Sequence, residues 1–140
     1  NSRLDNIQAS VANIKLKKIA TRIKKNQNFA KIYNSELSNI LITPNVYPYE
    51  KPVFHRYIVH LDKKYRKKFK NYLHNHGIET TINYGIPLHL QKSSRYLKYK
   101  IGSLPVSERL AKSMLSLPLY PELSINELDF TIKTIKKFFI

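Results

Sequence analysis

The sequence has no cysteine and only three glycines among its 140 residues. Without cysteine, a disulfide framework and thiolate sites for zinc or iron–sulfur clusters are excluded, and nothing indicates a secreted, oxidised setting. So few glycines argue against a glycine-rich loop that cradles phosphate. No apolar run approaches the length of a membrane span. From the sequence alone we therefore expect an intracellular, cytoplasmic protein without a membrane segment.

Acidic residues are also scarce. The sequence has 9 Asp and Glu against 25 Lys and Arg, which gives a formal net charge of +16. Such a charge is typical of proteins that bind nucleic acid or another polyanion. However, Lys, Asn and Ile are all abundant and share A/T-rich codons, so genome composition accounts for many exposed lysines. Lysine also exceeds arginine, on which base readout mainly depends. The sequence therefore favours another partner over nucleic acid, and a basic module that binds nucleic acid or another polyanion stays an alternative.

Apolar residues recur every three or four positions from Leu4 to about Leu41, which predicts one long helix or two helices in series. The phase of this pattern slips between Ile14 and Leu16 and again between Ile23 and Ala30, so one partner need not cover the whole length. A helix that links two bodies is the natural interpretation. We assign residues 1–41 to a linking helix region and residues 42–140 to a small C-terminal domain. Because the chain begins with Asn rather than Met, we expect further sequence upstream.

Downstream of this region, strand and helix patterns alternate, with caps that fit each helix. Asp62 and the pair Ser124 and Glu127 are suited to helix N-termini, and Gly77 to a helix end. We expect first an extended connector with Pro44, Pro48 and Pro52, then a strand over 53–61 and a helix after Asp62. A strand over 78–83 and a turn-rich loop over 84–91 should follow. The chain should end with a helix from Pro105 to about Leu115, with Val106, Leu110 and Met114 inward, and a helix after Ser124. This order predicts an α/β fold of the α+β type, a small sheet covered by helices.

Short motifs along the chain, taken in series, resemble the DegT/DnrJ/StrS family of pyridoxal-phosphate-dependent sugar-nucleotide aminotransferases. Each motif is weak alone, but together they keep the family's order and cover essentially the whole chain. They are Asn1-Ser2-Arg3 with the helix after it, Phe54 to Tyr57, Gly77-Ile78, Tyr84 to Gln91, Leu104 to Glu108 and Leu115 to Leu123. The chain is similar to the C-terminal part of such an enzyme.

The resemblance implies a type I aminotransferase fold, in which a large domain carries the cofactor and a small C-terminal domain closes over the substrate. It implies a homodimer that moves an amino group, usually from glutamate, to a keto-sugar nucleotide for polysaccharide or amino-sugar synthesis. The family's Schiff-base lysine lies upstream of the Asn-x-Arg motif, so no lysine here takes that role. We expect no catalytic residue in this chain, no pyridoxal phosphate bound by it alone, and the missing large domain as its partner.

Four residues are candidate site residues by this resemblance. Asn1 and Arg3 match residues that reach across the dimer interface toward the neighbouring subunit's cofactor, and an amide and a guanidinium suit a phosphate dianion. The alternative is that both are frayed at a chain end. Tyr84 and His89 match the loop on the substrate side, where a phenol and an imidazole can hydrogen-bond a sugar hydroxyl or a phosphate, or else simply pack that loop. Many members have His directly before this Tyr, whereas this chain has Asn83, so we assign that position no proton relay.

Other functions stay open beside this one. The chain could be the non-catalytic product of a split or decayed gene that only self-associates, or a basic module that binds a polyanion. Without a large domain, the apolar face formed by Leu4, Ile7, Val11 and Ile14 should be partly uncovered and promote self-association. The histidines His60, His74 and His76 lack the carboxylate or cysteine spacing of a metal site, so we predict no metal.

Overall fold

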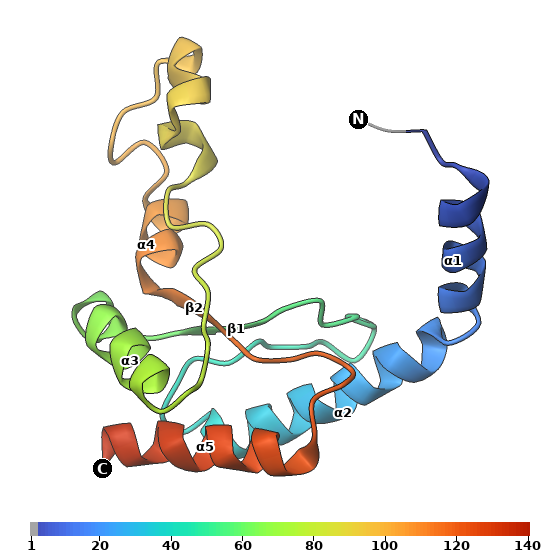
Figure 1. The fold of residues 1–140 in the computed structure, drawn as a ribbon. Helices are drawn as coiled ribbons and strands as arrows, with labels where there is room; N and C mark the ends of the chain where they lie inside the picture. The colour runs from blue at the N-terminus through green and yellow to red at the C-terminus, as the bar shows by residue number, and fades with distance from the viewer. Residues whose placement is uncertain (1–2) are drawn as a thin grey trace.

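The computed structural model of the protein describes residues 3–140 (Figure 1). Helices and two short strands alternate along the chain, and the C-terminal helix packs beside the second helix. The elements are α1 (Asn6–Leu16), α2 (Ile19–Leu37), β1 (Tyr57–His60), α3 (Lys63–Asn75), the 3-10 helices η1 (Leu88–Leu90) and η2 (Lys92–Leu97), α4 (Pro105–Ser113), β2 (Met114–Leu117) and α5 (Ile125–Phe139). A small sheet covered by helices is confirmed.

The apolar pattern at the start of the chain forms two helices in series, not one long helix. The break falls at Lys17 and Lys18, directly after the phase slip between Ile14 and Leu16, and α1 turns away from the axis of α2 there (Figure 1). The second slip, between Ile23 and Ala30, falls within α2 and does not interrupt it. No residue of α1 is buried. α2 is different, because its second half carries Phe29, Ala30, Tyr33 and Leu37 into the core.

The core lies between α2, α5, α3 and the sheet. Its largest fully buried side chains are Tyr33, Tyr57, Phe69, Leu37, Leu73, Leu115, Leu123, Leu128, Ile135 and Val59. Each large apolar side chain buried in this way contributes roughly 1.5–3 kcal/mol of transfer free energy. The Tyr33 hydroxyl is buried without loss of hydrogen bonding, because it donates to the Pro118 carbonyl at 2.9 Å. The helix predicted after Ser124 is present as α5, and it buries Leu128, Ile132 and Ile135 while Phe139 at its end is exposed.

The sheet has two antiparallel strands, with Tyr57 opposite Leu117 and His60 opposite Met114. The strand predicted over 53–61 is shorter than expected, because Phe54 has a positive φ of 48° and interrupts the extended backbone. The strand predicted over 78–83 is wrong as a regular element, since only a single bridge joins Thr81 to Ser116 there. That bridge still places the segment beside β2.

The helix predicted from Pro105 begins where expected but ends earlier and faces the other way. It ends at Ser113, and the next four residues form β2, a strand that the sequence analysis missed. Val106 and Leu110, predicted to face inward, are exposed, whereas Glu108 and Ala111 are buried. The physical reason is that the carboxylate of Glu108 has polar partners on the inner side of the helix.

Helix termini follow the predicted caps. Asp62 accepts a hydrogen bond from the Lys64 amide at 2.9 Å, and Gly77 ends the turn after α3 with a φ of +75°. Ser124 and Glu127 form a reciprocal capping box, with Ser124 N–H donating to the Glu127 carboxylate at 2.7 Å and Glu127 N–H donating to the Ser124 hydroxyl at 3.2 Å.

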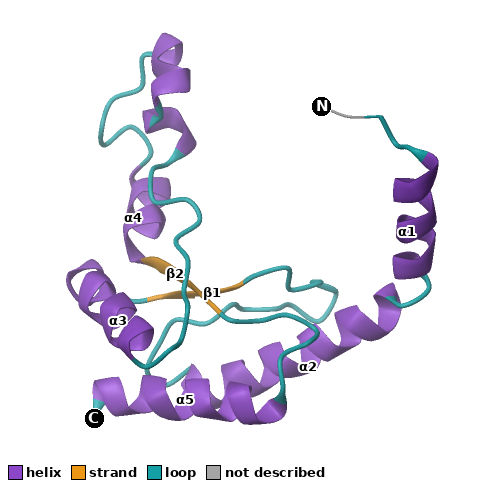
Figure 2. Cartoon of the chain, in the orientation of Figure 1, coloured by secondary structure: helices purple, strands orange, loops and turns teal. Residues whose placement is uncertain are grey.

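One long excursion of irregular structure leaves this body. Residues 84–104, which we call the arm, run out past α4 through η1 and η2 and return to the start of α4 (Figure 2). The arm and α1 are the two parts of the molecule that project away from the core (Figure 1). Both carry apolar side chains that the chain itself does not cover.

Candidate functional site

The two candidate cofactor residues stand at the N-terminal end. Asn1 lies outside the described residues. Arg3 is exposed and precedes α1, with no acidic partner among the described residues. The structure does not bring Arg3 together with Tyr84 or His89, because α1 and the arm project from different parts of the body (Figure 1).

Tyr84 stands at the start of the arm and its side chain is 73% exposed. The peptide bond that joins it to Asn83 is cis. Asn83 is tied to the sheet, since its side-chain amide donates to the Thr81 hydroxyl at 2.8 Å. Tyr84 lines a hollow of about 240 Å³ between the arm and one side of α4, together with Asn83, Ile86, Pro87, Leu88, Ser107, Leu110, Ala111 and Met114. Its phenol is therefore free to meet a group from outside the chain.

His89 lies on η1 and, unlike Tyr84, is buried. Its Nε2 is 3.2 Å from Oε1 of Glu108, which is also buried. The ring of Tyr99 meets the imidazole edge to face, with 5.9 Å between ring centroids. A buried polar pair of this kind is stable only when both groups are hydrogen-bonded.

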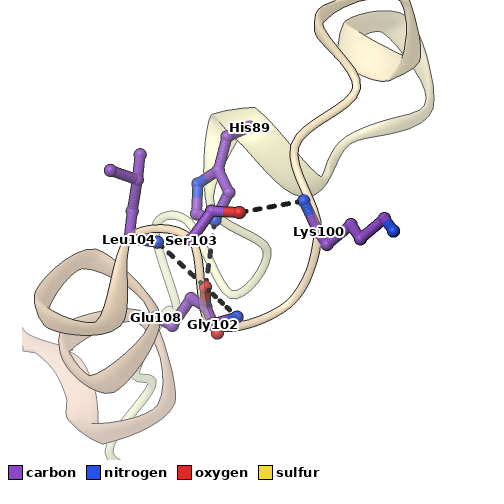
Figure 3. Close-up of polar contacts among 6 residues, drawn as sticks. All are labelled: His89, Lys100, Gly102, Ser103, Leu104 and Glu108. Carbon is purple, nitrogen blue, oxygen red and sulfur yellow. Dashed lines mark hydrogen bonds and ion pairs between the residues drawn. The ribbon is translucent and has the colours of Figure 1, made fainter.

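Glu108 is the centre of a small cluster that also includes His89, Gly102 and Leu104, which we call the Glu108 cluster (Figure 3). The same carboxylate oxygen accepts from the Gly102 N–H at 2.8 Å and from the Leu104 N–H at 3.4 Å. Beside it, a turn is closed by the Lys100 N–H, which donates to the Ser103 hydroxyl at 3.0 Å. Gly102 has a φ of +92°, a conformation that favours glycine.

The electrostatics of the Glu108 cluster favour an ionised carboxylate. Burial acts to raise the pKa of Glu108, but the Gly102 N–H, the His89 ring and the Leu104 N–H together hold that pKa below its usual value. The carboxylate also sits in the first turn of α4, where the helix dipole favours negative charge. An ionised carboxylate only accepts hydrogen bonds, so the shared proton belongs to Nε2 of His89.

Glu108 belongs to a motif noted in the sequence, but the sequence analysis gave it no role. A usable signal was present. Leu104, at the N-cap of α4, has no side chain that can cap, and Pro105 offers no N–H. An acid four residues after such a cap can reach back to the free Leu104 N–H, in the manner of the return contact of a capping box.

A second polar contact was also missed. Nδ1 of His60 is 2.8 Å from the hydroxyl of Ser113, at one wall of a cavity of about 910 Å³ between the end of β1, the start of α3 and α4. Burial lowers the pKa of His60, so the ring is neutral near neutral pH. The Ser113 hydroxyl also donates to the Leu110 carbonyl at 3.2 Å and is then the acceptor from His60. That arrangement is not an activated nucleophile.

Among the described residues, no group of three or more His, Cys, Asp or Glu side chains is placed to hold a metal ion. Within the same part of the chain, none of the helices has the length and apolar character needed to cross a bilayer.

Comparison with known proteins identifies the fold that carries these residues. The model of the DegT/DnrJ/EryC1/StrS aminotransferase family matches residues 1–136. This chain belongs to that family. The resemblance inferred from the short motifs is thereby confirmed over nearly the whole chain.

Individual members agree with this assignment. A dTDP-3-amino-3,6-dideoxy-alpha-D-galactopyranose transaminase of Aneurinibacillus thermoaerophilus is 32% identical over 139 residues, which cover 99% of this chain and 37% of that enzyme. The crystal structure of a family aminotransferase from Brucella abortus superposes with a TM-score of 0.90 at 34% identity, covering 99% of this chain and 36% of that one. DesV of S. venezuelae, solved in complex with a ketimine intermediate, gives a TM-score of 0.92 at 30% identity, with 99% and 37% covered. The chain therefore corresponds to a C-terminal part of these family members and spans little more than a third of their length.

Proposed function

We propose that this chain is the C-terminal part of a pyridoxal-phosphate-dependent aminotransferase that transfers an amino group, usually from glutamate, to a keto-sugar nucleotide. The observation that carries the proposal is the superposition on DesV, in which 99% of this chain matches 37% of an enzyme solved with a ketimine intermediate. The Aneurinibacillus relative, a transaminase for a dTDP-linked amino sugar, supports the same substrate class.

The exposed apolar surfaces support a large domain as the missing partner. Just before α1, Leu4 is 73% exposed, and on α1 Ile7 is 80% exposed and Val11 and Ile14 are also uncovered. The arm and the start of α4 carry a second set, namely Tyr84, Ile86, Leu88, Tyr96, Leu97, Tyr99, Ile101, Leu104, Val106 and Leu110. Apolar surface of this extent marks contacts with another domain or subunit. We propose that a large cofactor domain and a second subunit cover both surfaces, with residues 1–41 as the linking region and residues 42–140 as the small domain.

The described residues fit only part of a pyridoxal phosphate site. The exposed guanidinium of Arg3 suits a phosphate dianion, and we propose that Asn1 and Arg3 reach the cofactor phosphate of a neighbouring subunit. By the family resemblance the Schiff-base lysine lies upstream of the Asn-x-Arg motif, so we propose none of the lysines of this chain for that role. When bound, the cofactor supplies an electron sink for the transfer, and the large domain would have to hold it covalently.

On the substrate side, we propose that Tyr84 and His89 act differently. The exposed phenol of Tyr84 is suited to a direct hydrogen bond with a sugar hydroxyl or a phosphate oxygen. His89 is buried against Glu108, so we propose that it holds the arm in shape and that its second ring nitrogen, Nδ1, accepts a hydrogen bond from the substrate side.

A non-catalytic role in self-association is a second candidate, and the uncovered face of α1 favours it. In that case the chain would be the product of a split or decayed gene. The two candidates differ in whether a cofactor domain accompanies this chain.

Reading the nucleotide sequence upstream of the Asn1 codon is the first test. An uninterrupted frame with a lysine-bearing cofactor domain supports the aminotransferase, and the joined protein should bind pyridoxal phosphate and transfer amino groups from glutamate to a keto-sugar nucleotide. If the frame is interrupted, a large domain encoded nearby is produced together with this chain and the same two properties are measured. If neither the joined protein nor, where the frame is interrupted, the co-produced pair of chains binds pyridoxal phosphate or transfers amino groups, the proposed function is rejected.

A further inference from the structure

The arm has no apolar core of its own. Between residues 82 and 110, all of which the structure describes, His89 and Glu108 are the two buried residues, and every apolar side chain of that stretch is partly or fully exposed. The buried contact that holds the arm together is therefore the polar pair of His89 and Glu108. Such contacts are directional, so they fix a geometry where an apolar patch would permit sliding.

The carboxylate of Glu108 contacts both ends of the arm. His89 lies near the outgoing end, and Gly102 and Leu104 lie at the returning end (Figure 3). Leaving a buried carboxylate without partners is costly, so the three contacts stabilise one another. One side chain of α4 thus closes the loop formed by residues 89–104.

The same carboxylate determines which ring nitrogen of His89 carries the proton. The hydrogen bond to Glu108 places a proton on Nε2, and in the neutral ring Nδ1 is then the acceptor. A carboxylate that orients an imidazole and fixes its tautomer is a recurrent device in metal sites and catalytic triads.

We propose that Glu108 is the positioning residue of the arm, which fixes the path of residues 84–104 and holds the ring proton of His89 on Nε2 so that Nδ1 is the free acceptor. What Nδ1 meets in a complete enzyme rests on the proposed function. The placement of the arm and of the ring proton does not.

NMR of the 15N-labelled 140-residue chain tests the proposal without any need for activity. Glu108→Ala and Glu108→Gln are compared with Glu79→Ala and Glu79→Gln, which make the same chemical changes at an exposed glutamate. Two quantities are measured, the exchange rates of the Gly102 and Leu104 amides and the tautomer of the His89 ring from its 15N shifts.

In Glu108→Ala we expect exchange at both amides to rise by about tenfold or more, because a hydrogen bond to a charged group is lost. The ring of His89 should become a mixture of tautomers, while exchange in β1, β2 and α5 stays unchanged. In Glu108→Gln the retained side-chain oxygen can still accept from the two amides and from Nε2 of His89, because all three contact the same oxygen. Amide protection and the parent tautomer should therefore both largely return. The Glu79 variants should match the parent chain.

Unchanged amide exchange in Glu108→Ala, or a His89 ring that keeps the parent tautomer in that variant, overturns the proposal. If Glu108→Ala does not fold, Glu108→Asp, whose carboxylate is one methylene shorter, is measured in its place, and parent-like exchange or the parent tautomer in that variant overturns the proposal. In the assembled aminotransferase, Glu108→Ala should raise KM for the nucleotide sugar by about tenfold and change kcat by no more than about twofold, since it disturbs placement and not chemistry. An assembly without any transferase activity rejects the proposed function but leaves the NMR result standing.

Discussion

The rings of Tyr33 and Tyr57 stack in the centre of the core with 4.7 Å between their centroids, and Tyr57 donates its hydroxyl proton to the side-chain oxygen of Asn34. The pair joins α2 to β1, so it connects the helix that begins the core to the strand that begins the sheet. Because both hydroxyls are bonded within the protein, the phenols are stable there only in their protonated form.

Folding stability should therefore fall at high pH. Burial raises the pKa of Tyr33 above its usual value of 10.0, so the folded chain keeps a proton that the unfolded chain loses. Burial raises the pKa of Tyr57 in the same way. The contribution of these two tyrosines should be constant below about pH 9 and decline above about pH 10, by up to about 1.4 kcal/mol per pH unit for each tyrosine. Urea unfolding of the parent chain and of Tyr33→Phe at a series of pH values measures this. Tyr33→Phe should be about 1 kcal/mol less stable than the parent chain at neutral pH, and its stability should decline less steeply above about pH 10.

Tyr49→Phe, at an exposed position, is the control and should behave like the parent chain. Equal declines in all three chains would exclude Tyr33 as the cause.

The cap of α5 should have a measurable effect on stability. Ser124→Ala removes the hydroxyl that accepts the Glu127 N–H and leaves that donor without a partner. We expect a loss of about 0.5–2 kcal/mol in the free energy of unfolding, measured by urea denaturation. Ser93→Ala, at an exposed serine of η2, is the matched control and should change stability very little. A loss of the same size in both variants would contradict a specific role of the cap.

Gly77 should be costly to replace although it has space around it. No heavy atom lies within 4 Å of the position where a Cβ would stand, but its φ of +75° disfavours any residue with a Cβ. Gly77→Ala should reduce the free energy of unfolding by about 1–2 kcal/mol. Gly85→Ala provides the opposite case, since its φ is not positive and the added Cβ would only press on Ile82 at 3.3 Å. If Gly77→Ala is the milder of the two, backbone conformation is not what selects glycine there.

The uncovered face of α1 should drive association of the isolated chain. Ile7→Asp combined with Ile14→Asp should shift the monomer–oligomer equilibrium in sedimentation toward monomer, by about tenfold in concentration or more, because two large apolar side chains leave the contact. The same two changes should leave the unfolding free energy nearly unaltered, since no residue of α1 is buried. Ile125→Asp, at an exposed position that opens α5, is the control and should associate like the parent chain. A parent chain that stays monomeric at high concentration would refute this expectation.

Local chemistry was the part of this fold that the sequence revealed well. The caps at Asp62 and at Ser124 with Glu127 depend on neighbours three residues away or fewer, and the structure has them as expected. The phase slip after Ile14 marked the end of α1 for the same reason. Each of these features is determined within one or two turns of helix.

Features that depend on distant partners were harder to predict. β2 follows α4 without a break, and its residues Met114 and Leu115 also fit the helical period, so only pairing with β1 shows it to be a strand. The face of α4 was reversed because Glu108 finds partners on the arm, which apolar periodicity does not count. The burial of His89 has the same origin. Whether Asn1, Arg3, Tyr84 and His89 contact cofactor or substrate stays a prediction.

The packing of α2 against α5 has a consequence for the order of events on the ribosome. α2 is synthesised before α5, but the two helices pack together, and Tyr33 and Leu37 share one buried core with Leu128, Ile132 and Ile135, about a hundred residues further along the chain. The strands between them pair residues 57–60 with 114–117, another long-range closure. The nascent chain therefore exposes an apolar face of α2 until α5 emerges, and exposed apolar surface of this kind favours aggregation during that interval.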